Sequence, residues 1–231
     1  MSQHTFRRRL GDGRAGQGRR ARWRAGRAVL PELAACTALL LTVSGACAQV
    51  ALPGERAKGR PDAPVTLFEM SDFQCPYCRE FALETMPVLE RQYVATGKVR
   101  FVFINFPLVR THAHAFVAAE VAMCAAAQDR FWQMHDLLFE RQPVWAAQSD
   151  PVPYLTALAD SAGVVPADFA RCMADKAVDP IIQADAAAAA RTGAHSTPTF
   201  YIEGGLLEGA APLSVFRMVI DSVYRTKTAG H

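Results

Sequence analysis

The sequence predicts an α/β protein in which one sheet is built from both ends of a single domain, with a long helical insertion between them. Three observations predict this class. Residues 64–106 show a strand–helix–strand pattern, residues 108–193 are alanine-rich and helical, and residues 197–229 show a strand–strand–helix pattern. The chain has 231 residues, 51% apolar and 20% charged, which suffices for one hydrophobic core.

The first 48 residues differ from the rest and predict a signal peptide. Nine arginines lie within the first 27 residues. The apolar stretch Leu33–Ala48 follows them and is shorter than the ~20 residues that a membrane span needs. Ala46 and Ala48 have the Ala-x-Ala spacing of a cleavage site. We therefore expect cleavage near Ala48 and a periplasmic or otherwise exported protein. An uncleaved anchor and a lipoprotein at Cys47 are the alternatives.

Removal of this leader changes the charge of the protein. Residues 1–48 hold nine arginines and two acidic residues, so the remaining chain has 16 basic and 20 acidic residues and its formal charge changes from +3 to −4. The remaining basic residues are scattered and form no run interleaved with aromatic residues, which argues against nucleic-acid binding. We expect residues 49–63 to be an extension and residues 64–229 to be the folded domain, with the insertion at about 108–193.

The first half of the domain begins with Pro64–Met70, a short apolar run with β-branched residues that predicts a strand. A helical pattern follows from about Pro76 to Tyr93, with a bend expected at Pro87. Lys98–Phe106 predicts a second strand, parallel to the first because a crossover helix joins the two. This is a β-α-β unit.

The middle of the chain predicts five helical pieces separated by Pro, Gly, Asp and Ser. The alanine run near its end is a helix and not a linker, because alanine favours helix and Gly193 stands where a carboxyl-terminal cap belongs. The pieces are HAFVAAEVAMCAAA, RFWQMHDLLFE, PYLTALADSAG, PADFARCMADK and PIIQADAAAAARTG.

The last half of the domain returns to strand character in Thr197–Gly209. Glu203, Gly204 and Gly205 can turn one strand into an antiparallel partner, and an amphipathic helix follows from about residue 212 to 225. Both ends of the domain are therefore expected to share one sheet.

Two cysteines separated by two residues, Cys75 and Cys78, lie where the first strand leads into its helix. Outside the leader the chain has two more cysteines, Cys124 and Cys172, and four cysteines allow three connectivities. The short spacing suits a redox-active ring between Cys75 and Cys78. We therefore pair Cys124 with Cys172, which stand apart in helical segments.

Pro76 suits the first turn of a helix, which places Cys75 at the helix amino terminus. Free N–H groups and the helix dipole stabilise a thiolate there, so Cys75 is the expected attacking thiol. Cys78 lies one turn further in and is the expected resolving thiol. Catalysis predicts an exposed Cys75, whereas a structural staple predicts a buried, unreactive pair.

A metal site and a diffusible cofactor are not expected. A structural zinc site needs four ligands and usually repeats the CxxC motif, which occurs once in this chain. The redox group would be the Cys75–Cys78 disulfide itself.

Six motifs, in this order and spacing, resemble the DsbA-like thioredoxin-fold thiol-disulfide oxidoreductases, over about residues 61–224. This resemblance implies a thioredoxin fold with an all-helical domain inserted between its β-α-β and β-β-α halves. The motifs are FEMSDFQCPYC, FINFPL, AAEVAMCAA, FWQMHDLLF, FARCM and STPTFYIEG.

The resemblance also implies roles for residues outside the CPYC motif. Thr197–Pro198 would have a cis peptide bond facing the active-site disulfide, with an ordinary trans proline as the alternative. An incoming polypeptide would pair with the neighbouring backbone, so Thr197, Pro198, Pro76 and Tyr77 are the expected substrate-binding residues.

Glu69 occupies the position at which related proteins carry a buried acid that transfers a proton to the second cysteine, here Cys78. A buried carboxyl has a raised pKa and can act as a base near neutral pH. The alternative is a solvated glutamate at a strand end.

Cys124 and Cys172 match positions that form a second disulfide in part of this family, and closing such a loop stabilises by ~4 kcal/mol on the chain-entropy model. Two buried free thiols are the alternative.

Other residues near the cysteines are given structural roles. Asp72 is expected to cap or turn into the helix, and Phe73 to shape the apolar surroundings of the sulfurs or to be core. His195 is either near the cysteine pair or a loop histidine. His112, His114 and His135 are expected to be helix caps or core.

The sequence therefore predicts an exported, monomeric protein disulfide oxidoreductase that oxidises cysteine-containing exported proteins and exchanges electrons with a membrane redox partner. Tyr77 stands where the strongly oxidising DsbA proper has histidine. Thr197, directly before Pro198, resembles the residue at this position in the isomerases of the family. A reductase or isomerase is thus one alternative. A non-catalytic peptide-binding chaperone with a structural CxxC is the other.

Overall fold

The computed structural model describes residues 56–229. The predicted signal peptide, its cleavage site near Ala48 and most of the predicted extension lie outside this range. Within it, the order β-α-β, helical insertion, β-β-α is confirmed. None of the helices in the described part is long and apolar enough to cross a membrane.

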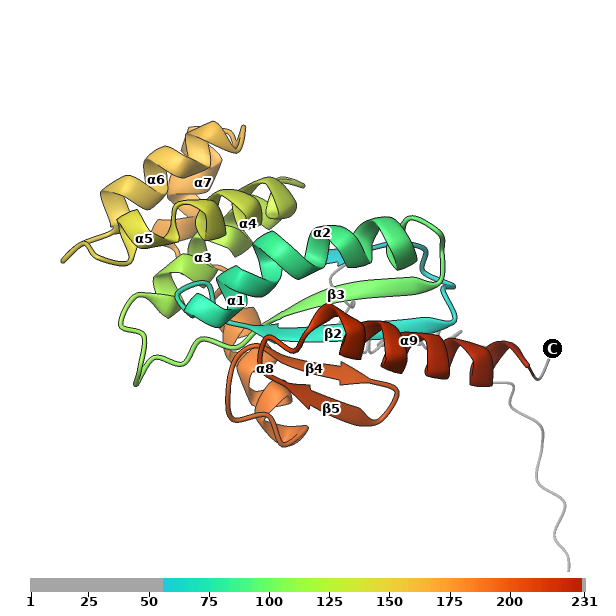
Figure 1. The fold of residues 1–231 in the computed structure, drawn as a ribbon. Helices are drawn as coiled ribbons and strands as arrows, with labels where there is room; N and C mark the ends of the chain where they lie inside the picture. Colours follow the sequence, from blue (N-terminus) through green and yellow to red (C-terminus); the bar gives the residue numbers. More distant parts are fainter. Residues whose placement is uncertain (1–55, 230–231) are drawn as a thin grey trace, which may run out of the picture. The chain divides into compact units, whose positions relative to one another are not determined.

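A five-stranded sheet in the order β1-β3-β2-β4-β5 forms the centre of the domain (Figure 1). β2 and β3 are parallel, with Glu69 opposite Phe103, and the remaining neighbours are antiparallel. Because β4 pairs with β2, the end of the chain completes the sheet that the first half begins. The strands are β1 (Ala57–Lys58), β2 (Val65–Ser71), β3 (Val99–Asn105), β4 (Thr199–Ile202) and β5 (Gly205–Glu208).

The predicted long helix after β2 is present and includes two π-helical turns. It lies across one face of the sheet (Figure 1). The π turns flank Pro87, which has no N–H to donate and disturbs the regular hydrogen-bond ladder. Its parts are α1 (Pro76–Glu80), η2 (Phe81–Thr85), α2 (Met86–Leu89) and η3 (Glu90–Val94).

The insertion contains six helices, one more than the sequence predicts. The additional helix, α5, has four residues and Pro143 in its first turn, so it is too short to show a helical period. The six are α3 (Ala115–Ala126), α4 (Phe131–Glu140), α5 (Gln142–Trp145), α6 (Val152–Ser161), α7 (Pro166–Ala174) and α8 (Asp179–Arg191).

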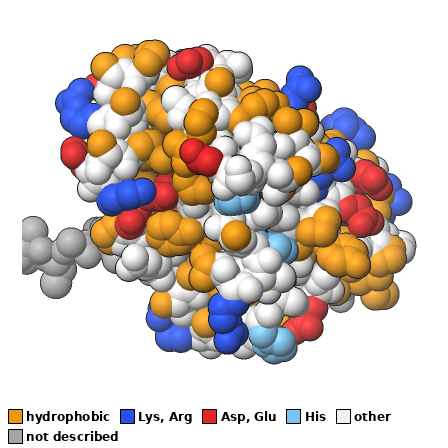
Figure 2. All heavy atoms as spheres, turned by 90° about the vertical axis from the view of Figure 1, so that its left-hand side faces the viewer, with side chains coloured by type: hydrophobic (Ala, Val, Ile, Leu, Met, Phe, Trp, Pro, Cys, Tyr) orange, Lys and Arg blue, Asp and Glu red, His pale blue; other side chains and the backbone are white. Residues whose placement is uncertain are grey.

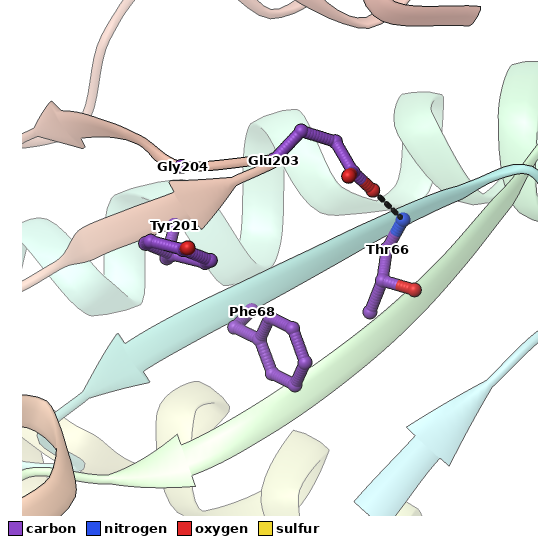
Figure 3. Close-up of a pocket in the computed structure, with 5 residues that line it drawn as sticks. All are labelled: Thr66, Phe68, Tyr201, Glu203 and Gly204. Atoms are coloured by element: carbon purple, nitrogen blue, oxygen red, sulfur yellow. Dashed lines mark hydrogen bonds between the residues drawn. The ribbon is translucent and has the colours of Figure 1, made fainter. Parts of the chain in front are cut away.

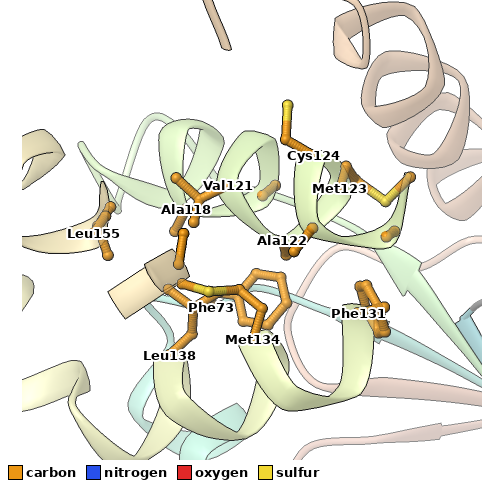
Figure 4. Close-up of a cluster of buried hydrophobic side chains, with 14 of the residues drawn as sticks. Phe73, Ala118, Val121, Ala122, Met123, Cys124, Phe131, Met134, Leu138 and Leu155 are labelled. Atoms are coloured by element: carbon orange, nitrogen blue, oxygen red, sulfur yellow. The ribbon is translucent and has the colours of Figure 1, made fainter. Parts of the chain in front are cut away.

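The insertion shares a hydrophobic core with the segment that carries the cysteines. Phe73, 1% exposed, lies between the apolar side chains of α3 and α4 (Figure 4) and stacks on Phe103 with ring centroids 5.0 Å apart. Phe73 is thus core, and the position of the cysteine segment depends on how the insertion packs.

The domain begins before residue 64, which corrects the expected boundary. Ala57 and Lys58 pair with β3, and Arg56 is 1% exposed. The Arg56 guanidinium forms an ion pair with Asp185 of α8, whose carboxylate also accepts a 2.8 Å hydrogen bond from the Asn105 amide. A two-residue strand has too little pattern to be recognised in the sequence.

The last half matches the prediction closely. Glu203 and Gly204 form the tight turn between β4 and β5 and both have positive φ, 46° and 90°. α9 (Leu213–Thr228) then buries Phe216 and Ile220 in a second hydrophobic core, to which the long helix contributes Phe81 and Leu89.

Candidate functional site

The cysteine motif begins where β2 ends and a tight turn leads into α1. Cys75 is the residue before the helix, in extended conformation, and Pro76 occupies the first turn as predicted. The Asp72 carboxylate accepts a 2.8 Å hydrogen bond from the Gln74 N–H, which closes this turn. The local sequence thus places Cys75 at the amino terminus of α1.

Asp72 also joins this turn to the segment that follows β3. Its carboxylate is buried and accepts hydrogen bonds of 2.8 Å from the Leu108 N–H and from His112 Nδ1. Asp72 was expected to serve the helix alone. It instead holds together two loops at the cysteine end of the sheet.

The Cys75 sulfur is a free thiol that lies 3.2 Å from the Thr197 carbonyl oxygen. The pKa of Cys75 is lowered from 9.0 to about 6. The hydrogen bond from the Cys78 thiol is the largest cause, and burial opposes it. The Thr197 side chain and the N–H groups of Cys78 and Tyr77 lower the pKa further, so the helix terminus contributes less than the sequence suggests.

Cys75 is only 4% exposed, which corrects the expectation of an exposed attacking thiol. The Thr197 backbone lies over the sulfur on one side. A partner must therefore reach the sulfur through the small part of Cys75 that is exposed.

Cys78 is a free thiol with no exposed surface. The N–H of Asp72 points at its sulfur at 3.5 Å. Burial raises the pKa of Cys78 well above 9.0, and the neighbouring Cys75 and Glu69 raise it further. The two thiols therefore differ strongly in acidity, with Cys75 as the thiolate and Cys78 as the protonated partner.

Glu69 is buried on β2, 1% exposed, so the alternative of a solvated glutamate is wrong. Burial raises the pKa of its carboxyl from 4.5 to about 8; Ser71 opposes this rise and the charge of Cys75 adds to it. Among the described residues, Glu69 Oε1 has no hydrogen-bond partner. This carboxyl can be protonated near neutral pH.

The Thr197–Pro198 peptide bond is cis, and the Thr197 carbonyl meets the Cys75 sulfur. Tyr77 is 61% exposed and Pro76 is also exposed, beside the nearly buried Cys75. Figure 2 views this side of the molecule: apolar side chains are spread over the face, and charged ones lie mostly toward its edge.

Cys124 of α3 and Cys172 of α7 form a disulfide, so the alternative of two free thiols is wrong. The bond joins residues 48 positions apart and connects two helices of the insertion. It is separate from the Cys75–Cys78 pair.

The histidines contribute little to the cysteine site. His195 is exposed and lies 3.5 Å from Glu208, as a loop histidine would. His135 is buried among aromatic rings of the core, and burial lowers its pKa. His114 precedes α3 without capping it through its side chain, and His112 bonds to Asp72 as described above.

Gln142 contacts the cysteine segment and was not singled out in the sequence. It is 5% exposed, and its amide donates to the carbonyl oxygens of Phe73 and Cys75. Arg79 makes a similar connection by donating to the Phe139 carbonyl oxygen at 3.0 Å. A lone glutamine in a helical region carries no sequence signal of such a contact.

A hollow in the surface lies away from the cysteines, at the opposite end of the sheet. Thr66 and Phe68 of β2, Tyr201 of β4 and the Glu203–Gly204 turn line this cavity of about 400 Å³ (Figure 3). Its one carboxylate, that of Glu203, forms a 2.7 Å ion pair with Lys227. In the described range, no cluster of three or more His, Cys, Asp or Glu side chains could hold a metal ion.

A CxxC motif at a helix amino terminus, beside a cis-proline and within this sheet, defines a thioredoxin-like redox protein. The family model described as Thioredoxin matches residues 51–222. The chain belongs to this family, and the resemblance to DsbA-like proteins and the expected fold are confirmed.

Two similar solved structures support this fold. The oxidised BdbD of Bacillus subtilis has a TM-score of 0.67 and 24% identity, covering 74% of this chain and 92% of that one. Wolbachia pipientis alpha-DsbA1 has a TM-score of 0.66 and 24% identity, covering 76% and 93%.

Curated relatives include the disulfide bond formation protein D of Bacillus subtilis, 24% identical over 78% of this chain and 81% of that protein. A Na(+)/H(+) antiporter NhaA 3 of Salinispora tropica is 31% identical over 170 residues, 74% of this chain. The chain spans 25% of the length of that antiporter. The similarity to this relative thus concerns one part of a larger protein.

Proposed function

We propose that this protein is an exported thiol-disulfide oxidoreductase that oxidises cysteine-containing exported proteins through Cys75 and Cys78. The observation that carries this proposal is the contrast between the two thiols, with a pKa of about 6 for Cys75 and a strongly raised pKa for the buried Cys78. A stabilised Cys75 thiolate favours the reduced form of the pair, which makes its disulfide a good oxidant.

The reaction starts from the Cys75–Cys78 disulfide. A substrate thiolate attacks Cys75 Sγ, a mixed disulfide forms, and Cys78 leaves as a thiolate. Protonated Glu69 supplies the proton that Cys78 takes up, since both groups are buried and Glu69 titrates near neutral pH. A second substrate thiolate then attacks the substrate sulfur and releases Cys75. Two electrons pass from the substrate dithiol to the CPYC pair.

Thr197, Pro198, Pro76 and Tyr77 are the proposed substrate-binding residues. The Thr197 carbonyl lies against the Cys75 sulfur, and Pro76 and Tyr77 are exposed beside it. An extended substrate segment would pair with the backbone near Pro198 and place its cysteine at the opening over Cys75.

Export, a monomeric state and a membrane redox partner complete the proposal. The Cys124–Cys172 disulfide supports export, because such bonds persist in oxidising compartments. The substrate dithiol leaves the protein reduced, so each turnover requires a partner that takes two electrons from Cys75 and Cys78. No diffusible cofactor or metal ion is part of the proposed reaction.

The direction is tested by the equilibrium of the Cys75–Cys78 pair with glutathione. A reduction potential of about −120 to −150 mV would support an oxidase. A value of about −250 mV or below would disprove the oxidising direction and support a reductase or isomerase.

A non-catalytic chaperone with a structural CxxC is the second candidate, because both sulfurs are nearly or fully buried. Incubation of the oxidised protein with a reduced, unfolded model protein separates the two. The oxidoreductase transfers its disulfide to that protein, and Cys75→Ser abolishes the transfer. A structural CxxC would leave the model protein reduced.

A further inference from the structure

Gln142 is the one side chain of α5 that reaches the backbone of the cysteine motif in the described structure. Its Nε2 donates to the Phe73 carbonyl oxygen at 2.7 Å and to the Cys75 carbonyl oxygen at 3.0 Å. A side-chain amide has two N–H groups, so both are used on these two residues.

The position of Gln142 is fixed by its neighbours. Trp145, three residues later, has no exposed surface, and its indole N–H donates to the Leu138 carbonyl oxygen at 2.8 Å. This bond attaches α5 to the end of α4. Gln142 therefore presents its amide from a rigid support, and the bonds to the cysteine segment connect that segment to the insertion.

The two carbonyl groups belong to the turn from Asp72 to Cys75, which a 3.0 Å hydrogen bond from the Cys75 N–H to the Asp72 carbonyl oxygen closes. The Cys75 carbonyl oxygen also accepts a 3.1 Å hydrogen bond from the Arg79 N–H, whereas Gln142 is the donor that the described structure gives to the Phe73 carbonyl. A buried carbonyl without a donor is costly, so without the Gln142 amide the turn at Phe73 would rearrange to find water or another donor. Such a movement would shift the Cys75 sulfur relative to Cys78, Thr197 and the first-turn N–H groups, which are the groups that lower its pKa. The carbonyl dipoles, no longer neutralised, would also oppose a negative charge beside them.

We propose that Gln142 is a positioning residue for the redox reaction: its amide holds the Phe73 and Cys75 carbonyls and thereby keeps the Cys75 sulfur in the geometry that stabilises its thiolate. The role of this thiolate in exchange rests on the proposed function. Gln142 itself does not touch the reacting sulfur atoms in this arrangement, and it acts through the backbone of Cys75.

The test compares Gln142→Met, Gln142→Glu and Leu155→Ala with the wild type. Methionine keeps the shape and loses both donors, and ionised glutamate places a negative charge against the two carbonyls. Leu155 is fully buried in the core of the insertion and serves as a control for general loosening. The reduced proteins are alkylated with iodoacetamide across pH 4–9, and the pair is equilibrated with glutathione at pH 7.

In Gln142→Met, the midpoint of Cys75 alkylation should rise by about half to one pH unit, and the glutathione equilibrium should shift about threefold to fivefold toward the disulfide. Gln142→Glu should shift the alkylation midpoint and the glutathione equilibrium at least as far as Gln142→Met. This second variant keeps the test valid if the methionine variant does not fold. Leu155→Ala should lower the unfolding midpoint and move the alkylation profile less than either Gln142 variant does, because Leu155 belongs to the shared core and donates no hydrogen bond to the cysteine segment.

The proposal is overturned if the profiles of the Gln142 variants overlay the wild type, or if Leu155→Ala moves the profile equally. Alkylation needs no exchange partner. A wild type that alkylates near pH 6 and exchanges with no disulfide would disprove the proposed function, while the comparison of alkylation profiles would still decide the role of Gln142.

Discussion

The Cys75 sulfur and the Thr197 carbonyl oxygen lie 3.2 Å apart, although 122 positions separate the two residues. The sheet explains this proximity. β2 leads to Cys75 and β4 follows Pro198, and these strands pair with Met70 opposite Thr199. The helical insertion leaves the sheet after β3 and returns just before this contact. The site is therefore assembled by strand pairing, and the insertion covers it through the shared core around Phe73.

The first prediction concerns the reactivity of Cys75. Its alkylation rate should rise with pH around a midpoint of about 6, because the thiolate is the nucleophile. Cys78→Ala should move this midpoint upward, since the Cys78 hydrogen bond is the largest cause of the lowered pKa. Rates of iodoacetamide labelling between pH 4 and 9 measure both. A wild-type midpoint close to 9.0, the ordinary value, would contradict the assigned environment.

The same shift predicts how the stability of the reduced protein depends on pH. The folded-state pKa of Cys75 lies below its unfolded value, so the thiolate contributes stability above the unfolded pKa of 9.0, and this contribution is lost as the pH falls toward about 6. The raised pKa of Cys78 has the opposite effect on stability, because the folded state disfavours the Cys78 thiolate, so the free energy of unfolding falls as the pH rises above 9.0. Urea unfolding of the reduced wild type and of reduced Cys75→Ser, at pH 6 and 8, isolates the Cys75 contribution, because Cys78 stays protonated at both pH values. Equal differences at the two pH values would refute it.

Glu69→Gln should stabilise the protein at neutral pH and slow disulfide exchange. The pKa of Glu69 is raised from 4.5 to about 8, so its contribution to stability is complete below pH 4.5 and is lost as the pH rises through about 8. Glutamine does not ionise, so Glu69→Gln should raise the free energy of unfolding by on the order of 3 kcal/mol at pH 7 and leave it unchanged at pH 4. Without the proton donor, exchange should slow at least about tenfold.

Two measurements check the Glu69 prediction. Urea unfolding of reduced Glu69→Gln and reduced wild type at pH 4 and 7 gives the stability difference at each pH, in the state to which the pKa of about 8 applies. Stopped-flow kinetics of the reaction with a reduced peptide gives the exchange rate. Equal stability at pH 7 together with an unchanged rate would mean that Glu69 is neither destabilised by burial nor involved in proton transfer.

The sequence predicted the elements with a clear local signal. The β-branched run before the cysteines, proline directly after Cys75 and the Glu203–Gly204 turn each act through nearest neighbours, and each is found where expected. The resemblance to a family added what spacing alone could not, namely that Glu69 would be buried and that Thr197–Pro198 would face Cys75.

The remaining features depend on contacts between distant parts of the chain. The burial of Cys75 results from its contact with Thr197, and no local pattern reports it. Gln142 acts through backbone carbonyls about 70 positions earlier, and sequence separations of 69 and 67 leave no periodic trace. Arg56 falls in the expected extension 49–63, and its burial was not predicted because its partner Asp185 lies 129 positions away.

Arg56→Met should destabilise the protein by about 3 kcal/mol, because it leaves the Asp185 carboxylate without its buried cation. The double variant Arg56→Met, Asp185→Asn should cost less than Arg56→Met alone, since asparagine is neutral and still accepts a hydrogen bond from Asn105. Urea unfolding of the three proteins gives these differences. A cost below about 0.5 kcal/mol for Arg56→Met would show that the pair is effectively solvated.

Replacing both Cys124 and Cys172 by alanine should lower stability by up to about 4 kcal/mol, the chain-entropy value for a bond between residues 48 positions apart. The cost should appear in thermal unfolding, and the alkylation midpoint of Cys75 should stay at about 6, because neither cysteine is among the groups that lower the pKa of Cys75. A Cys75→Ser, Cys78→Ser background isolates this bond, since a reductant then acts on Cys124–Cys172 alone among the described cysteines. In that background, reductant should lower the unfolding temperature to that of the alanine variant. If the Cys75 midpoint moves with the loss of this disulfide, the insertion transmits its own redox state to the site, and the two cysteine pairs are coupled.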